Sequence, residues 1–212
     1  MKRSGLVIVS GLIIGLLSIV LSHQGNPANM GVCVACFIRD IAGGLGLHRS
    51  AAVQYLRPEV PGFILGATIV SSITGEFRAR GGSSPIIRFV LGFLMMIGAL
   101  AFLGCPLRMV LRLAAGDLNA LVGLFGFAAG VGVGVAFLRR GFSLGRSTRQ
   151  PQFNGTVMPA LAAAIVVLAV AAPAFIFFSQ SGPGSMHAPI LISLAAGLIV
   201  GILAQRARFC MA

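Results

Sequence analysis

Charge is scarce in this sequence, and acidic charge above all. Only 9% of the 212 residues are charged, against about a quarter in a soluble domain, so there is too little polar surface to cover a water-facing globule. The four acidic residues are Asp40, Glu59, Glu76 and Asp117. No Ser-His-Asp arrangement, phosphate loop or paired carboxylates stand out, and proton-coupled chemistry has few candidates beyond Asp40 and Asp117. We therefore expect neither a soluble domain nor an enzyme.

Apolar and basic residues are what the sequence has in excess. Hydrophobic residues make up 57% of the chain, and 29 residues are glycine, which is commoner in membrane-spanning helices than in soluble ones. The 16 Lys and Arg residues bring the formal net charge to +12, but they stand in short loops between apolar runs. A nucleic-acid-binding protein would instead need a basic face on a soluble fold. We predict an all-α, polytopic protein of the cytoplasmic (inner) membrane. Its expected partner is the lipid bilayer, and we expect it to bind no nucleic acid.

Six apolar runs approach or reach the length needed to cross a bilayer, about 17–25 residues. The first, residues 5–22, is longer than the apolar core of a signal peptide, and no small-residue cleavage site follows it. We therefore predict a retained helix there. The other spans are predicted at residues 60–74, 86–104, 118–138, 157–178 and 189–204.

Two further apolar segments, residues 32–47 and 106–115, are too short to span and are interrupted by charge. Arg39 and Asp40 lie in the first, and Arg108 and Arg112 in the second. Short segments of this kind, flanked by Gly or Pro, are typical of re-entrant half-helices, which occur at membrane depth only where protein or a water-filled path surrounds them. An amphipathic helix lying in the interface is the alternative.

The basic loops predict the orientation. If every span crosses once, four groups of basic residues fall on one side, which the positive-inside rule makes cytoplasmic, together with the N-terminus. Residues 23–57 and 179–188 then face outward, although His48, Arg49 and Arg57 weaken the charge asymmetry there. The four groups are Lys2 and Arg3; Arg78 and Arg80; Arg139, Arg140, Arg146 and Arg149; and Arg206 and Arg208.

A short internal similarity predicts a repeat. Residues 32–35 read VCVA and residues 209–212 read FCMA, each after an apolar span. If the two correspond, the first and sixth spans run in opposite directions, as in the inverted-topology repeats of secondary transporters. We therefore expect one membrane domain over residues 1–212, with a first repeat at about 1–150. The second repeat would begin at about 151–212 and be incomplete at the C-terminus.

The four cysteines are Cys33, Cys36, Cys105 and Cys210. No second cysteine pair stands at zinc-ligand spacing, and Cys33 and Cys36 lack the βαβ context of a thioredoxin-like site, so we expect no metal and no cofactor. Three of them, Cys33, Cys105 and Cys210, stand at the start of a predicted half-helix, where free N–H groups and the dipole favour an anion and a thiol can donate a weak hydrogen bond. A buried cysteine that serves only as a small hydrophobe is the alternative.

Intramembrane charges are costly and mark candidate functional sites. Arg39 and Arg108 therefore join the cysteines as candidate residues of a substrate path. Arg39 and Asp40 are adjacent in the sequence, so they point in different directions on a helix and need not pair. Arg108, Arg112 and Asp117 form a similar group, for which interfacial anchoring by snorkelling side chains is the alternative.

Three stretches resemble the YedE branch of the YeeE/YedE membrane-protein family. They are residues 26–40 (NPANMGVCVACFIRD), 102–108 (FLGCPLR) and 116–120 (GDLNA). The similarity covers essentially the whole chain, whereas members of the family are generally longer. The resemblance implies an inner-membrane transporter of sulfur compounds: the YeeE branch is associated with thiosulfate uptake and the YedE branch with selenium. It also implies that Cys33, Cys105 and Cys210 pass an anion along by hydrogen bonding, and it leaves the role of Cys36 open.

The function expected from these features is a permease for a small sulfur- or selenium-containing species, such as thiosulfate or an inorganic selenium compound. Two alternatives stay open. One is a membrane thiol protein that uses Cys33 and Cys36 for disulfide exchange or sulfur transfer. The other is a non-transporting membrane subunit whose basic cytoplasmic loops dock a soluble sulfur or selenium carrier protein.

Overall fold

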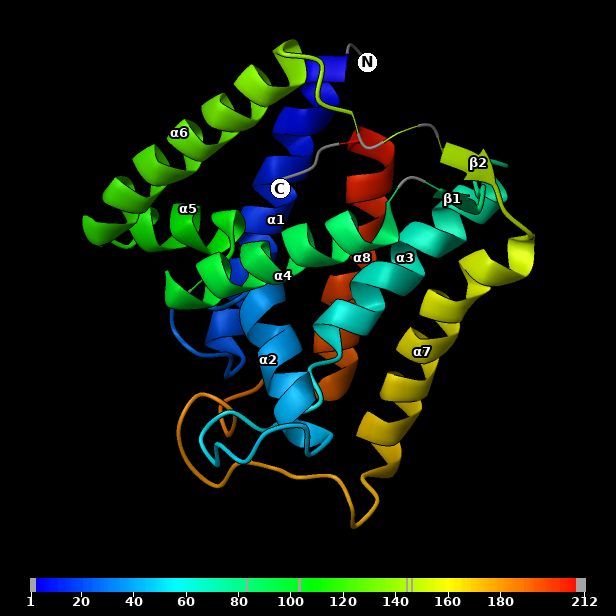
Figure 1. Cartoon of the computed structure of the whole chain (residues 1–212). Helices are drawn as coiled ribbons and strands as arrows, with labels where there is room; N and C mark the ends of the chain where they lie inside the picture. The colour runs from blue at the N-terminus through cyan, green and yellow to red at the C-terminus, as the bar shows by residue number, and fades with distance from the viewer. Residues whose placement is uncertain (1–2, 83, 103, 144, 146, 209–212) are drawn as a thin grey trace.

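The computed structural model describes residues 3–82, 84–102, 104–143, 145 and 147–208, and there it is helical apart from one short ribbon of two strands (Figure 1). The all-α prediction is therefore confirmed. The elements in chain order are α1 (Arg3–His23), α2 (Val34–Gly44), α3 (Glu59–Ile73), β1 (Arg80–Gly82), α4 (Pro85–Ala101), α5 (Pro106–Ala114), α6 (Asn119–Arg139), β2 (Ser147–Arg149), α7 (Gln152–Ala171) and α8 (Ile190–Ala207).

Five helical segments are long and apolar enough to cross a membrane: α1, the segment that contains α4 and α5, α6, α7 and α8. This is the helix content of a multi-pass membrane protein. The predicted span at 60–74 is the exception. Its helix, α3, has 15 residues and is about 22 Å long, less than the roughly 30 Å of a hydrocarbon core.

The predicted span at 157–178 is wrong at its end. The helix α7 begins at Gln152 and stops at Ala171, and Ala172 takes a left-handed conformation with φ of 42°. The reason lies in Pro173, because proline cannot donate the next helical hydrogen bond and disfavours helical backbone in the residue before it. Residues 172–189 therefore form a long loop, and the apolar run continues into it without helix.

The helix α3 packs against both α7 and α8, and glycines bring α3 and α8 very close. Gly62 and Gly66 on α3 face Gly197 and Gly201 on α8. A Cβ at Gly62 would lie 2.7 Å from the carbonyl oxygen of Leu194, so the two backbones touch where side chains would otherwise separate them. This is the close approach that small residues four apart permit between membrane helices.

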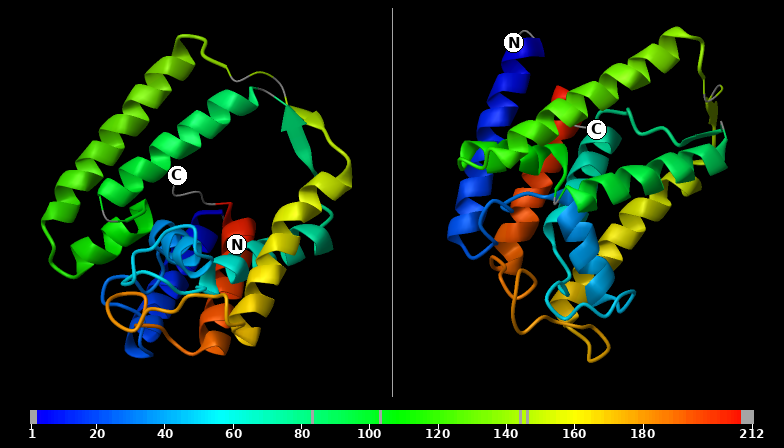
Figure 2. Two further views of the ribbon diagram at one scale, coloured as in Figure 1. Left: turned by 60° about the horizontal axis from the view of Figure 1, so that its bottom comes forward. Right: turned by 60° about the vertical axis from the view of Figure 1, so that its left-hand side comes forward.

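The helices α4, α5 and α6 form an arm beside the bundle of α1, α3, α7 and α8 (Figure 2). Among the described residues, α4 buries none and α6 buries Ala120 and Gly123. Most apolar side chains of this arm are therefore exposed, as expected of surfaces that face lipid or another protein.

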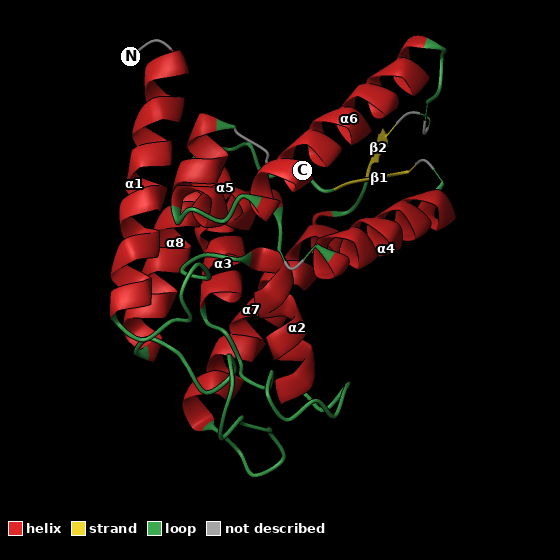
Figure 3. Ribbon diagram, turned by 90° about the vertical axis from the view of Figure 1, so that its left-hand side faces the viewer, coloured by secondary structure: helices red, strands yellow, loops and turns green. Residues whose placement is uncertain are grey.

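The basic loops gather at one end of the bundle, as predicted. The strands β1 and β2 pair antiparallel with Arg80 opposite Arg149, which joins the loop after α3 to the loop after α6. Arg208, after α8, forms an ion pair of 2.7 Å with Glu76. The N-terminal end of α1 lies toward the same end (Figures 1 and 3). That this end is cytoplasmic stays a prediction, as does the repeat, because residues 209–212 lie outside the described residues.

The loops at the opposite end also meet each other (Figure 3). Gly184 N–H donates to the carbonyl of Ala52 at 2.8 Å, and Ser179 N–H donates to the carbonyl of Gln54 at 2.8 Å. The two segments predicted to face outward thus form one layer of loops, which covers the ends of α2 and α3.

Candidate functional site

Short helices form in both segments predicted to be half-helices, and each begins directly after a cysteine. That these helices enter the membrane without crossing it stays a prediction. Cys33 precedes α2 in an extended conformation, and Cys105 precedes α5 in the same region of backbone space. Pro106 occupies the first position of α5, where a proline is favoured because its missing N–H has no helical partner. Local sequence signals therefore place both thiols at helix N-termini.

The helices α2 and α5 bring three thiols together, and we call Cys33, Cys36 and Cys105 the thiol cluster. The sulfur atoms of Cys33 and Cys105 are 4.0 Å apart, although 72 residues separate them in the sequence. Arg108 Nη1 donates to the sulfur of Cys36 at 3.1 Å. Cys33 and Cys36 are buried and Cys105 is half-buried, and all three are free cysteines.

The thiol cluster borders a cavity of about 440 Å³, within the size range of small-molecule sites. Residues of α1, α2, α3, α4, α5 and α8 line it, among them Cys33 and Cys105. The lining is otherwise apolar, with one charged residue among its described members, Glu59. The cavity therefore combines a low-dielectric wall with two thiols and one carboxyl group.

Arg39 lies away from the cavity and is paired. Its Nη2 atom lies 2.8 Å from Asp40 Oδ1, so these neighbours do pair, although their adjacent positions on a helix do not require it. The physical reason is the length of the arginine side chain, which folds back along α2 toward a carboxylate that is fully buried. His48 Nε2 contacts the carbonyl of Arg39 at 3.0 Å.

Asp40 has a second partner, Arg57, which the sequence did not predict. Arg57 Nε lies 3.0 Å from Asp40 Oδ2, and both side chains are fully buried. Arg57 also donates to the carbonyls of Pro183 at 2.7 Å and Met186 at 3.0 Å, and its guanidinium lies 4.8 Å from the ring centre of Phe37. Arg57 lies in a loop in the sequence, and in the structure it fastens the loop layer to α2.

Glu59 was also missed as a site residue. Its Oε1 atom accepts hydrogen bonds from Asn26 Nδ2 at 2.9 Å and from Ser193 Oγ at 3.0 Å. Its Oε2 atom is buried and has no hydrogen-bond partner among the described residues. Asn26 in turn accepts from the N–H of Ala188 at 2.9 Å. The signal in the sequence was the scarcity of acids in an apolar chain.

Arg112 and Asp117 have a local role at the turn between α5 and α6. Arg112 Nε donates to Asp117 Oδ2 at 2.8 Å, and Asn119 N–H donates to Asp117 Oδ1 at 3.0 Å. The hydrogen bond from Arg112 holds the pKa of Asp117 below its ordinary value. This pair closes a turn at the surface and does not border the cavity.

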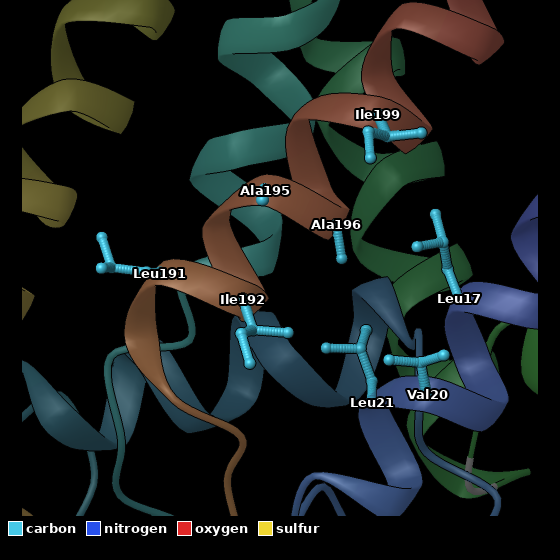
Figure 4. Close-up of a pocket in the computed structure, with 8 residues that line it drawn as sticks. All are labelled: Leu17, Val20, Leu21, Leu191, Ile192, Ala195, Ala196 and Ile199. Carbon is cyan, nitrogen blue, oxygen red and sulfur yellow. The ribbon is translucent and has the colours of Figure 1, made fainter.

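An apolar groove between α1 and α8 is a weaker candidate (Figure 4). Its volume is about 280 Å³, and its lining consists of Leu, Ile, Val and Ala side chains. Nothing in it could orient a polar or charged ligand. Within the described part of the chain, no group of three or more His, Cys, Asp or Glu side chains is placed to hold a metal ion, and Cys210 lies outside that part.

Comparison of the chain with protein-family models, with curated proteins and with solved structures finds no match. The described part of the chain is thus a helical fold with five segments that could cross a membrane, and it holds a cavity beside the thiol cluster.

Proposed function

We propose that the protein is a membrane permease for a small sulfur- or selenium-containing anion, as the resemblance to the YeeE/YedE family implies. The observation that carries the proposal is the position of Cys33 and Cys105. Both stand at half-helix starts on the wall of one cavity, with their sulfur atoms 4.0 Å apart.

The chemistry of this arrangement favours an anion with a polarizable atom. The N-terminal ends of α2 and α5 contribute free N–H groups and the positive ends of two helix dipoles. Half-helix N-termini that point at an anionic group are a recurring device of secondary transporters. The thiols of Cys33 and Cys105 are weak hydrogen-bond donors, which can hold a sulfur or selenium atom and release it again.

The position of Arg108 beside Cys36 also favours an anionic cargo. It stands on the first turn of α5 and donates to Cys36 rather than entering the cavity lining. A positive charge placed behind the thiols raises the local concentration of anions without offering a tight ion pair that would hold the cargo. Arg39 contributes less, because it is paired with Asp40 and is not part of the cavity lining.

Uptake measurements test the proposal. Proteoliposomes or cells carrying the protein are supplied with labelled thiosulfate and, separately, labelled selenite. Cys105→Ala removes one donor to the anion, and a hydrogen bond to a charged group is worth about 1.5–3 kcal/mol. We expect uptake to fall about tenfold or more, whereas Val110→Ala, at an exposed position of the same half-helix, is the matched control. Unchanged uptake by Cys105→Ala would refute the thiol path.

The distance between Cys33 and Cys105 also favours a second candidate, a membrane thiol protein for disulfide exchange or sulfur transfer. Two thiols 4.0 Å apart can form a disulfide after a small movement of their side chains. Alkylation of the isolated protein followed by mass spectrometry distinguishes the two. A Cys33–Cys105 disulfide or a persulfide supports the second candidate, and fully alkylated thiols support the permease.

A further inference from the structure

Glu59 differs from the other three acidic residues in having no cationic partner. Asp40 is paired with Arg39 and Arg57, Asp117 with Arg112, and Glu76 with Arg208. Within the described part of the chain, no Lys, Arg or His nitrogen lies within 4.0 Å of the Glu59 carboxyl group. Yet only 4% of the surface of Glu59 is exposed, and of the other three acidic residues only Asp40 is more buried.

Glu59 is also one of the residues that line the cavity. One oxygen, Oε1, is held by Asn26 and Ser193, which fixes the group in place. The other oxygen, Oε2, is buried without a hydrogen-bond partner in the described residues, and Glu59 is part of the cavity lining. An ionisable side chain at such a position in a membrane protein marks an ion or proton path.

The groups around Glu59 come from four directions and leave its charge uncompensated. The segment after α1 contributes the neutral amide of Asn26, and α8 contributes the hydroxyl of Ser193. The loop before α3 contributes Tyr55 and Arg57, but Arg57 reaches Glu59 only through Asn26 and is committed to Asp40. The same cavity is lined by the thiols of Cys33 and Cys105, which precede α2 and α5.

Glu59 also has one feature that stabilises its charged form. It lies in the first turn of α3, where the positive end of the helix dipole favours a carboxylate. An apolar cavity without a cation penalises the same carboxylate. The two effects act on one group in opposite directions.

From this geometry we propose that Glu59 is the proton-binding residue of the cavity, and that its protonation is coupled to entry of the anion. The coupling rests on the proposed function. The ionised carboxylate repels an anion in the cavity; after Glu59 takes one proton from the outer solution, the neutral carboxyl admits the anion beside the thiols. The anion and the proton then leave to the cytoplasm, and Glu59 returns to the carboxylate. One proton is bound and one released in each cycle, with no bond to the cargo formed.

The proton-binding step can be tested without any cargo. Infrared difference spectra of the purified protein in lipid nanodiscs are recorded between about pH 5 and about pH 9, above the ordinary pKa values of carboxyl groups. A protonated carboxyl band that titrates in this range is expected in the wild type and in Glu76→Gln, whose carboxyl is exposed and paired with Arg208. Glu59→Gln keeps an oxygen for Asn26 and Ser193 and is expected to lack the band. A band retained in Glu59→Gln, or absent from the wild type, would overturn the proposal.

The coupling step is tested by uptake of labelled thiosulfate into proteoliposomes with an imposed pH gradient. Acidifying the outside by one pH unit is expected to raise wild-type uptake by up to about tenfold, because it changes the protonated fraction by that factor. Glu76→Gln should behave like the wild type, and uptake by Glu59→Gln should no longer respond to the gradient. Wild-type uptake that ignores the gradient refutes the coupling. If wild-type vesicles take up neither thiosulfate nor selenite, the proposed function fails, and the infrared titration still decides whether Glu59 binds a proton.

Discussion

The contact between α3 and α8 is the strongest test of the fold, and Gly66→Ala is the change that probes it. A Cβ at Gly66 would overlap the carbonyl oxygen of Leu198 on α8. The neighbour is backbone rather than the flexible end of a side chain, so it cannot rotate away. The helices must move apart, which loosens the contacts of Gly62, Gly197 and Gly201 in the same interface.

The expected magnitude follows from two opposing effects. Overpacking a well-packed interface costs about 1–3 kcal/mol, whereas alanine in place of glycine within a helix gains up to about 1 kcal/mol. Gly130→Ala in α6 is a matched control, because a Cβ there meets nothing within 4 Å and only the gain applies. The difference between the two variants therefore isolates the packing cost. We expect Gly66→Ala to be the less stable of the two by about 1–3 kcal/mol.

Unfolding of the purified protein in mixed micelles with increasing sodium dodecyl sulfate, followed by far-ultraviolet circular dichroism, measures this difference. Both variants are compared with the wild type at the same lipid and detergent composition. If Gly66→Ala proves as stable as Gly130→Ala, then α3 and α8 are not in backbone contact in the membrane. In that case the position of Glu59 beside α8, and the cavity argument built on it, would also have to be given up.

Two further predictions concern the loop layer. Arg57→Met leaves the buried carboxylate of Asp40 with only the half-exposed Arg39, and removing one partner of a buried pair costs about 3–5 kcal/mol. The double variant Arg57→Met/Asp40→Leu should recover most of this loss of stability in the same unfolding assay. If the losses of the two single variants simply add in the double variant, Arg57 and Asp40 do not form a direct pair. Burial, reinforced by the charge of Glu59, raises the pKa of Tyr55 from 10.0 to about 12. Because Tyr55 is the chain's one tyrosine, its absorbance titration reads this pKa directly, and a midpoint near 10 would contradict the buried position. The folded protein holds Tyr55 neutral, so this contribution is fully present below pH 10 and is lost as the pH rises through about 12, a change of roughly 2–3 kcal/mol.

Most helices were predictable from the sequence because the length of an apolar run is a local property. The runs at 5–22, 86–104, 118–138 and 189–204 all correspond to helices that end within a few residues of the prediction. The run at 157–178 failed at its end because hydropathy does not register a backbone constraint, and Pro173 imposes one. The same proline was visible in the sequence, so this error was avoidable.

The site was predictable in part. Cys105 could be placed at a helix start because Gly104 and Pro106 flank it, and Cys33 because Gly31 stands two residues before it. The proximity of their sulfur atoms, and the partners of Arg57, depend on contacts between segments up to 129 residues apart, which no single stretch of sequence encodes. The glycines of α3 and α8 are an intermediate case, since their spacing of four could have been recognised as a helix-packing signal.

Asn26 connects the two parts of the site, and its position explains why the sequence around it is polar. Its amide oxygen accepts from the N–H of Ala188 in the outer loop layer, and its amide nitrogen donates to Glu59 on the cavity wall. The loop layer, which Arg57 and Asp40 fasten, thereby also positions the carboxyl group of Glu59. Because a buried amide has one donor side and one acceptor side, neither an aspartate nor a leucine at this position could make both contacts. The outer loops and the cavity are therefore one structural unit, and Asn26 links the loop layer to Glu59 in addition to the chain itself, which runs from Arg57 into α3.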